Sequence, residues 1–195
     1  MNGSLYTYLW GRYDEMQVSP LQEGPTVPYT VIARVMILNE TIDGYPYTPK
    51  GEQAYGILFG ANNGTPCPAD RSTLKGTGCL SHYYRVLVAY DMGTGAYQWS
   101  LKRIDYHDPN NGGKGDGKTL LDWRAVKPGD ALGWNEWKIT VTNDSSKNIK
   151  VYLNGNLIGE ATDLTYVNER YFGTMMVSPA FGQAGAKWDW FKVQK

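Results

Sequence analysis

The 195-residue sequence has few of the residues on which zinc sites, disulfide frameworks and nucleophilic triads depend: it holds two cysteines and two histidines. A structural zinc site needs four ligands, and His82 alone stands near the cysteines. The Gly-x-Ser-x-Gly elbow of serine hydrolases is absent from the sequence. His82 falls at the start of an expected strand and His107 in an expected loop, so we interpret both as polar edge residues rather than general bases.

An excess of either charge and a long apolar run are also missing. The formal net charge is zero, which argues against the basic surface that nucleic-acid binding requires. No run of apolar residues approaches the roughly 20 needed to span a bilayer. The first ten residues lack the features of a signal peptide, so we expect either a trimmed exported protein, extracellular or at the cell surface, or a virion protein assembled inside a cell.

A third absence is helical periodicity, whose place is taken by short alternating segments. Seven Trp and fifteen Tyr enrich the chain in residues that favour strands. Alternation predicts strands, separated by Gly, Pro and Asn turns, at residues 29–38, 54–60, 82–91, 96–105, 136–142, 149–153, 171–177 and 186–193. In the segment 96–105, Tyr97, Trp99 and Leu101 face away from Gln98, Ser100 and Lys102.

The strongest local signal is Asn154-Gly155 between two apolar runs. Both central residues of a type I′ turn need a positive φ, which Asn and Gly tolerate, so this dipeptide predicts a tight hairpin. Together the strands predict an all-β, two-sheet antiparallel β-sandwich of the jelly-roll type. We expect one domain over residues 1–195, with opening strands and a connector at 1–28 and the sandwich core at 29–195.

Four segments in this order resemble the concanavalin A-like lectin/glucanase superfamily, which includes laminin-G-like domains and the domain of 3-keto-disaccharide hydrolases. They are Tyr55-Gly-Ile-Leu-Phe59, His82-Tyr-Tyr-Arg-Val-Leu-Val88 with Gly95-Ala-Tyr97, Trp137-Lys-Ile-Thr-Val141 with Ile149-Lys-Val-Tyr-Leu-Asn-Gly155, and Phe172-Gly173 with Trp188-Asp-Trp-Phe-Lys-Val193. The resemblance covers residue 29 to the end. It implies a jelly roll with one concave sheet whose face and rim loops hold saccharide, in some members with calcium.

Catalysis by a glycosidase needs two carboxylates on either side of the scissile bond. The Glu-x-Asp-x-x-Glu pattern of catalytic members of the superfamily is missing from the sequence. Asp14 and Glu15 are adjacent and would point to opposite faces of a strand, and Asp189 has no carboxylate two residues away. The resemblance therefore transfers no catalytic residue to this chain.

Sugar binding needs aromatic platforms beside polar groups that bond hydroxyls. The expected strand faces and loops offer such a set, although Trp123 and Trp134 could instead cap the core. The candidate ligand-binding residues are Tyr83, Arg85, Gln98 and Lys102 on the sheet, with Tyr106, Trp123 and Trp134 at its rim.

Two loops offer further candidates. Asp105, Asp108 and Asn110 carry oxygen ligands of the kind that calcium prefers, but their spacing does not match an EF-hand, and a solvated hairpin loop is the alternative. Cys67 and Cys79 share a segment rich in Gly, Pro and Thr. A disulfide between them would close a long loop and would form in an oxidising compartment. Because two cysteines alone make no disulfide framework, free thiols remain the alternative.

The leading functional hypothesis is a non-catalytic, lectin-like binding module for carbohydrate or a cell-surface glycan. The first alternative is a structural protein of a phage particle (capsid decoration or tail) or of a surface layer, packed against copies of itself as a homo-oligomer. The second is a divergent glycoside hydrolase or polysaccharide lyase. Fold alone does not separate these three.

Overall fold

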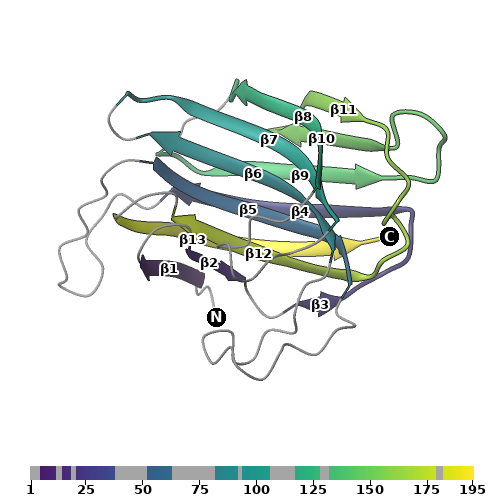
Figure 1. Ribbon diagram of the computed structural model, residues 1–195, viewed down its shortest axis with the longest axis horizontal. Coiled ribbons are helices and arrows are strands. Elements are labelled where there is room, and N and C mark those ends of the chain that lie inside the picture. Colours follow the sequence, from purple (N-terminus) through teal and green to yellow (C-terminus); the bar gives the residue numbers. More distant parts are fainter. Residues whose placement is uncertain are drawn as a thin grey trace.

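The structure is a computed structural model that describes residues 5–11, 15–18, 21–37, 52–62, 82–91, 94–105, 117–127, 132–178 and 182–195. Its described residues form thirteen strands and no helix, and so no helix able to cross a membrane. Figure 1 shows the strands stacked in two layers.

The first layer is a six-stranded antiparallel sheet in the order β1-β13-β4-β9-β10-β11. Its strands are β1 (Leu5–Gly11), β13 (Gly182–Gln194), β4 (Tyr29–Ile37), β9 (Asn135–Val141), β10 (Ile149–Leu153) and β11 (Asn156–Ala161). The hairpin predicted at Asn154-Gly155 is confirmed: φ is 48° at Asn154 and 81° at Gly155, and β10 pairs with β11 across this turn.

The second layer is a seven-stranded sheet in the order β2-β12-β5-β6-β7-β8, with β3 paired to β12 beside β2. Its strands are β2 (Glu15–Val18), β12 (Tyr171–Ser178), β5 (Glu52–Ala61), β6 (Tyr83–Asp91), β7 (Tyr97–Ile104), β8 (Gly117–Ala125) and β3 (Gln22–Glu23). The nine-residue β8 forms one edge of this sheet. The predicted two-sheet, all-β sandwich is confirmed.

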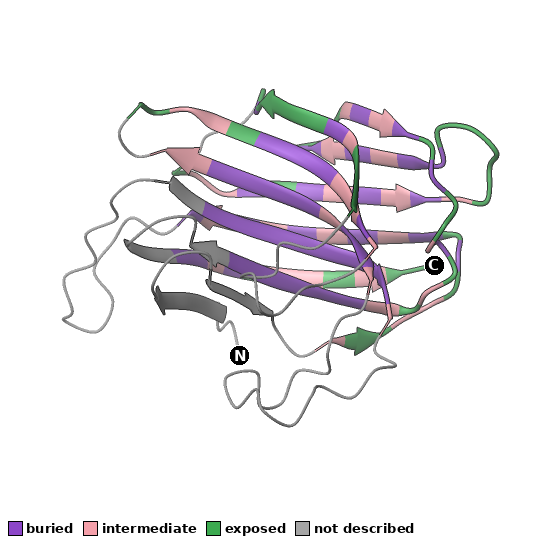
Figure 2. Ribbon diagram, in the orientation of Figure 1, coloured by how far each residue is buried: buried purple, intermediate pink, exposed green. Residues whose placement is uncertain are grey.

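Strand β4 shows how the alternation of side chains defines the inside of the sandwich. It lies between β13 and β9 in the six-stranded sheet. Its odd-numbered residues, from Val31 to Ile37, are buried, whereas its even-numbered residues are only half-buried. The far side of the six-stranded sheet is therefore partly open to solvent, which the continuous apolar character of residues 29–38 did not indicate (Figure 2).

The core between the sheets is built around large aromatic side chains from both layers. Trp99 of β7 and Trp137 of β9 lie with ring centroids 6.2 Å apart. The Trp137 indole Nε1 donates to the Tyr55 hydroxyl at 2.9 Å, and Tyr55 packs edge-on against Trp188 at 5.7 Å. Aromatic side chains of this size bury the largest apolar areas, so this inter-sheet contact fixes which face of each strand is internal.

Replacing Trp99 by alanine should therefore lower the free energy of unfolding by about 3–5 kcal/mol, the usual cost of removing a buried tryptophan. Chemical denaturation of the purified chain measures this change. Trp123→Ala is the matched control, because Trp123 is 38% exposed and should contribute far less. Equal losses in the two variants would show that Trp99 is not a core residue.

Candidate functional site

The outer face of the seven-stranded sheet carries the side chains that alternation keeps out of the core. On β7, Trp99 and Leu101 are buried between the sheets. Gln98, Ser100 and Lys102 therefore point to the opposite face of the same strand. The distribution of side chains predicted for this strand is confirmed.

The neighbouring strand β6 presents its odd-numbered residues on the same outer face, because Tyr84, Val86 and Val88 belong to the core. The antiparallel register sets three outward pairs side by side: Ala89 with Gln98, Leu87 with Ser100, and Arg85 with Lys102. Three of the candidate ligand-binding residues, Arg85, Gln98 and Lys102, are thereby brought onto one surface.

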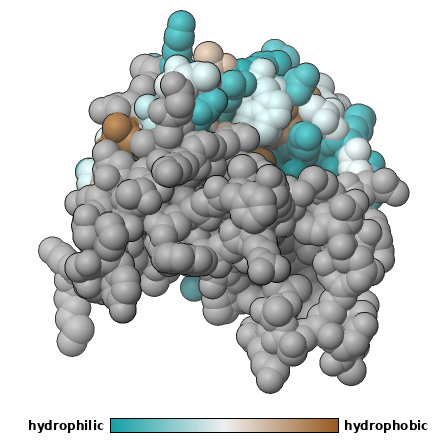
Figure 3. Space-filling model, turned by 60° about the vertical axis from the view of Figure 1, so that its left-hand side comes forward, coloured by the Kyte–Doolittle hydropathy of each residue, from teal (hydrophilic) through white to brown (hydrophobic). Residues whose placement is uncertain are grey.

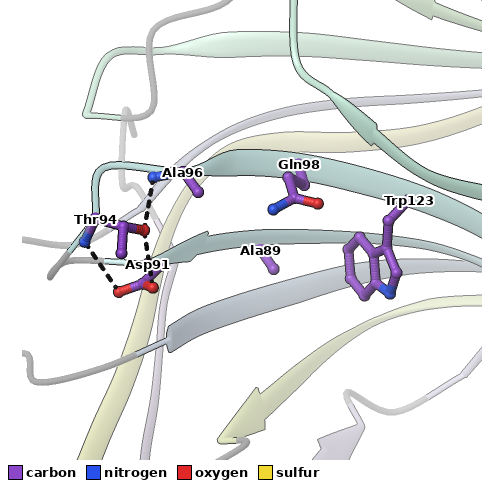
Figure 4. A pocket seen from close by; sticks show the side chains of 6 residues that line it. All are labelled: Ala89, Asp91, Thr94, Ala96, Gln98 and Trp123. Atoms are coloured by element: carbon purple, nitrogen blue, oxygen red, sulfur yellow. Dashed lines mark hydrogen bonds between the residues drawn. The ribbon is translucent and has the colours of Figure 1, made fainter.

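A hollow of about 470 Å³ lies on this face beside the turn that joins β6 to β7 (Figure 4). Gln98 and the ring of Trp123 border it, and 38% of Trp123 is exposed. The remaining lining residues are Ala89, Asp91, Thr94 and Ala96. An exposed indole beside a side-chain amide provides an apolar ring face and a hydrogen-bonding group for the same ligand.

Trp123 reaches this hollow because β8 departs from regular pairing. Leu121 is buried in the core, and a regular strand would point residue 123 to the same side. The pairing of β7 with β8 shifts between Trp99 and Leu101 and again between Leu101 and Lys102, so that extra residues stand in β8. Such bulges re-aim side chains at the edge of a sheet, and here Trp123 faces the hollow with Gln98.

The wall of the hollow at the hairpin end is held by hydrogen bonds around Asp91. The hydroxyl of Thr94 donates to the Asp91 Oδ2 at 2.9 Å, and the Ala96 amide donates to the Thr94 Oγ1 at 3.3 Å. Gly95 completes the turn with a φ of 71°, a value that favours glycine. These contacts give the hollow a fixed rim with one carboxylate in it.

Tyr83, another candidate ligand-binding residue, lies on the same outer face but is fully buried. It packs in a small apolar cluster with Leu58, Ala61, Ile104 and Met175. Burial raises the pKa of the Tyr83 hydroxyl, and the charge and hydrogen bond of Arg85, also on β6, partly offset this rise. Tyr83 thus forms a hydrogen bond with Arg85 and does not expose its ring face to solvent.

Trp134 lies apart from the hollow, on the outer face of the six-stranded sheet. The guanidinium of Arg34 is 5.2 Å from its ring centroid, and Arg34 also pairs with Asp189 at 2.8 Å. Asn135 and Trp137 of β9 point into the core, and Trp134, which directly precedes this strand, faces outward. The expected rim of Trp123 and Trp134 is therefore not assembled in this chain.

Asp105, a candidate calcium ligand, is engaged by an arginine. The Arg103 Nε donates to its Oδ1 at 2.6 Å and the Nη2 to its Oδ2 at 3.0 Å, and the Tyr166 hydroxyl donates to Oδ1 at 2.8 Å. The hydrogen bonds from Arg103 hold the pKa of Asp105 below its usual range. Its carboxylate thus already has a cation and three hydrogen bonds.

The Nη1 nitrogen of the Arg103 guanidinium binds the buried Asp163. The Arg103 Nη1 donates to the Asp163 Oδ2 at 2.7 Å, and the Tyr84 hydroxyl donates to Oδ1 at 2.6 Å. Burial alone would raise the pKa of Asp163, but the hydrogen bonds from Tyr84 and Thr165 and the charge of Arg103 outweigh it and lower that pKa. This network ties β7 to the segment between β11 and β12.

His82 lies near this network and behaves as the polar edge residue that we expected. Its ring stacks on Tyr166 with centroids 4.1 Å apart, and its Nε2 lies 3.3 Å from the Glu169 Oε1. The remaining predicted residues, Tyr106, Asp108, Asn110, Cys67 and Cys79, fall outside the described ranges. Within those ranges, no group of three or more His, Cys, Asp or Glu side chains could hold a metal ion.

Solved structures similar to this chain share its two-sheet architecture, at low sequence identity. A carbohydrate-binding module, CBM66, from Bacillus subtilis is 15% identical, with 97% of this chain and 95% of that chain covered and a TM-score of 0.54. The carbohydrate recognition domain of Emp46p, in its metal-free form, is 10% identical over 98% and 85% of the two chains, with a TM-score of 0.52. A legume lectin-like domain from Entamoeba histolytica is 10% identical over 100% and 81%, with a TM-score of 0.52.

These likenesses establish the fold: the chain has a concanavalin A-like jelly-roll fold, as its sequence segments indicated. No protein-family model matches the sequence, and no curated protein sequence does either. Identities of 10–15% transfer no residue role to this chain.

The Arg103 network makes stability depend on acid pH. The pKa values of Asp105 and Asp163 are lowered in the folded chain, so acid protonates these carboxylates in the unfolded chain first, near pH 4, and favours unfolding. The contribution of the two carboxylates to the free energy of unfolding is complete above that pH. It is lost as the pH falls through their pKa values in the folded chain. Thermal unfolding between pH 7 and pH 3 should show this loss.

Arg103→Met should remove about 3 kcal/mol at pH 7, because it leaves Asp163 buried without its cation, and should flatten the acid dependence. Lys147→Met is the matched control, since it breaks an exposed pair with Glu160 and should change the unfolding temperature much less. An acid dependence in Arg103→Met as steep as in the unchanged chain would contradict this account.

Proposed function

We propose that this chain is a carbohydrate-binding module that holds its ligand on the outer face of the seven-stranded sheet. The observation that carries the proposal is the exposed Trp123 ring beside Gln98 over a hollow of about 470 Å³. The apolar face of a sugar ring stacks on the indole, and the Gln98 amide bonds the ring hydroxyls from the side.

The geometry suits a sugar better than a purely apolar ligand. Asp91, Thr94 and Gln98 supply polar atoms around the hollow, and one aromatic ring supplies the apolar contact. Binding sites for small molecules combine an apolar surface with a few placed polar groups in this way. Three structures with TM-scores above 0.5 are named as a carbohydrate-binding module, a carbohydrate recognition domain and a lectin-like domain, which supports the same assignment.

We expect the natural ligand to be an extracellular or cell-surface glycan. The alternative of a particle or surface-layer protein would rest on a broad apolar surface for packing against copies of the chain. Among the described residues, the large exposed hydrophobic side chains are scattered over separate elements: Trp123, Leu132, Leu157 and Leu164. The described part of the surface in Figure 3 is correspondingly mostly hydrophilic, with small separate apolar areas.

Trp123→Ala should weaken glycan binding at least tenfold, because the variant removes the stacking surface and leaves the core intact. Tenfold corresponds to about 1.4 kcal/mol, within the range of a buried aromatic contact at an interface. A glycan array followed by titration calorimetry on the best ligand measures the effect.

Trp190→Ala is the matched control for this experiment, since Trp190 is on β13 of the other sheet, where it contacts Lys192. It should bind as the unchanged chain does. Undiminished binding by Trp123→Ala, with unfolding temperatures showing both variants folded, would place the ligand elsewhere and defeat the proposal.

A further inference from the structure

Two cations face each other on the proposed binding surface, four residues along the strands from the hollow. Arg85 of β6 and Lys102 of β7 are directly opposite partners in the antiparallel register, and both are half-buried. Like charges at directly opposed positions destabilise a sheet. A pair of this kind on a ligand-facing surface calls for an anion between its members.

Six other basic residues of the described structure have partners of opposite charge or aromatic character. Arg34 pairs with Asp189, Arg103 with Asp105 and Asp163, Lys147 with Glu160, and Arg170 with Glu23, while Lys138 and Lys192 lie over the rings of Tyr152 and Trp190. No carboxylate of the described ranges pairs with Arg85 or Lys102. Four further basic residues of the described ranges also have no such partner, but they are exposed, whereas Arg85 and Lys102 are half-buried: Lys118, Arg124, Lys127 and Lys195.

The hydrogen-bonding groups around the pair are also incompletely satisfied by the protein. Arg85 bonds the Tyr83 hydroxyl, which holds its guanidinium in place, yet its Nε is buried without a hydrogen-bond partner. The hydroxyl of Ser100, on β7 between Gln98 and Lys102, is buried without one as well. Unpaired buried polar atoms are rare in folded proteins and often mark positions where water or a ligand binds.

We infer that the ligand of this surface is an acidic oligosaccharide whose carboxylate or sulfate group lies between Arg85 and Lys102. The inference rests on the proposed carbohydrate-binding function and specifies its substrate class. Carboxylate and sulfate share the oxygen geometry that an arginine fork and a lysine ammonium recognise.

The two ends of the surface fit different parts of such a ligand. Gln98 and Lys102 are four residues apart on β7, which corresponds to roughly 13 Å along a strand. An anionic group is favoured at the cation pair of Arg85 and Lys102, which lies away from the hollow. A ligand that reaches from Gln98 to the cation pair is therefore longer than one sugar ring, which indicates an oligosaccharide rather than a monosaccharide.

General attraction to polyanions does not account for such binding, because the chain has a formal net charge of zero. The preference has to come from local charge and should weaken as salt rises. Two pairs of polymers with matched backbones isolate it: polygalacturonate against its methyl ester for carboxylate, and dextran sulfate against dextran for sulfate.

Affinity electrophoresis and calorimetry on the full chain should show at least tenfold tighter binding of one acidic polymer than of its neutral partner at low salt. Lys102→Gln and Arg85→Gln should each reduce that preference about tenfold or more. Lys138→Gln, which removes the same charge from β9 in the other sheet, should keep it. Unfolding temperatures check that each variant is folded, and the conservative Arg85→Lys should retain part of the preference.

Equal affinity for the acidic and neutral members, with binding still dependent on Trp123, would overturn the inference and leave the carbohydrate-binding proposal standing. An acidic preference that survives Lys102→Gln and Arg85→Gln, or that is lost in Lys138→Gln, would also overturn it. Binding to none of these polymers and to no glycan on an array would defeat both proposals together.

Discussion

The burial of Trp99 and Leu101 between the two sheets is the constraint on which the binding surface depends. Side chains alternate strictly along a strand, and a slip of one residue in register would reverse every side chain of β7. With Trp99 against Trp137 in the core, Gln98, Ser100 and Lys102 have to face outward. The same inter-sheet packing that stabilises the sandwich therefore arranges its proposed ligand contacts.

The two outer faces of the sandwich differ in how their cations are satisfied. On the six-stranded sheet, Lys138 lies over Tyr152 and Arg34 contacts both Trp134 and Asp189, so aromatic rings and a carboxylate stabilise these cations within the protein. On the seven-stranded sheet, Arg85 and Lys102 oppose each other and an exposed Trp123 ring is available nearby. We propose that the second arrangement, and not the first, binds a ligand.

The strand pattern of the sequence was sufficient to predict the sandwich, the Asn154-Gly155 hairpin and the outward face of β7, because each depends on local alternation or local φ preferences. The same alternation could have placed Trp134 outside, opposite the buried Trp137. Arg103 and Asp105, two residues apart, also share a strand side, so their ion pair had a local signal that the calcium hypothesis overlooked.

Other features depend on long-range packing and had no local signal. Asp163 meets Arg103 across 60 residues, and a charged residue in a loop does not indicate so distant a partner. The bulges of β8 depend on how that edge strand pairs with β7, and a regular strand would have turned Trp123 toward the core. The candidate site was therefore predictable on its two central strands and unpredictable at its edge.

The most direct test of the account follows the seven tryptophan indole N–H signals by NMR while an acidic oligosaccharide is titrated into the labelled chain. Trp123→Phe identifies the signal of Trp123. The account predicts that this signal shifts with saturation, while the signals of Trp134 and Trp190 on the other sheet stay in place. Saturable shifts at Trp134 or Trp190, with Trp123 unmoved, would contradict it and assign binding to the six-stranded sheet.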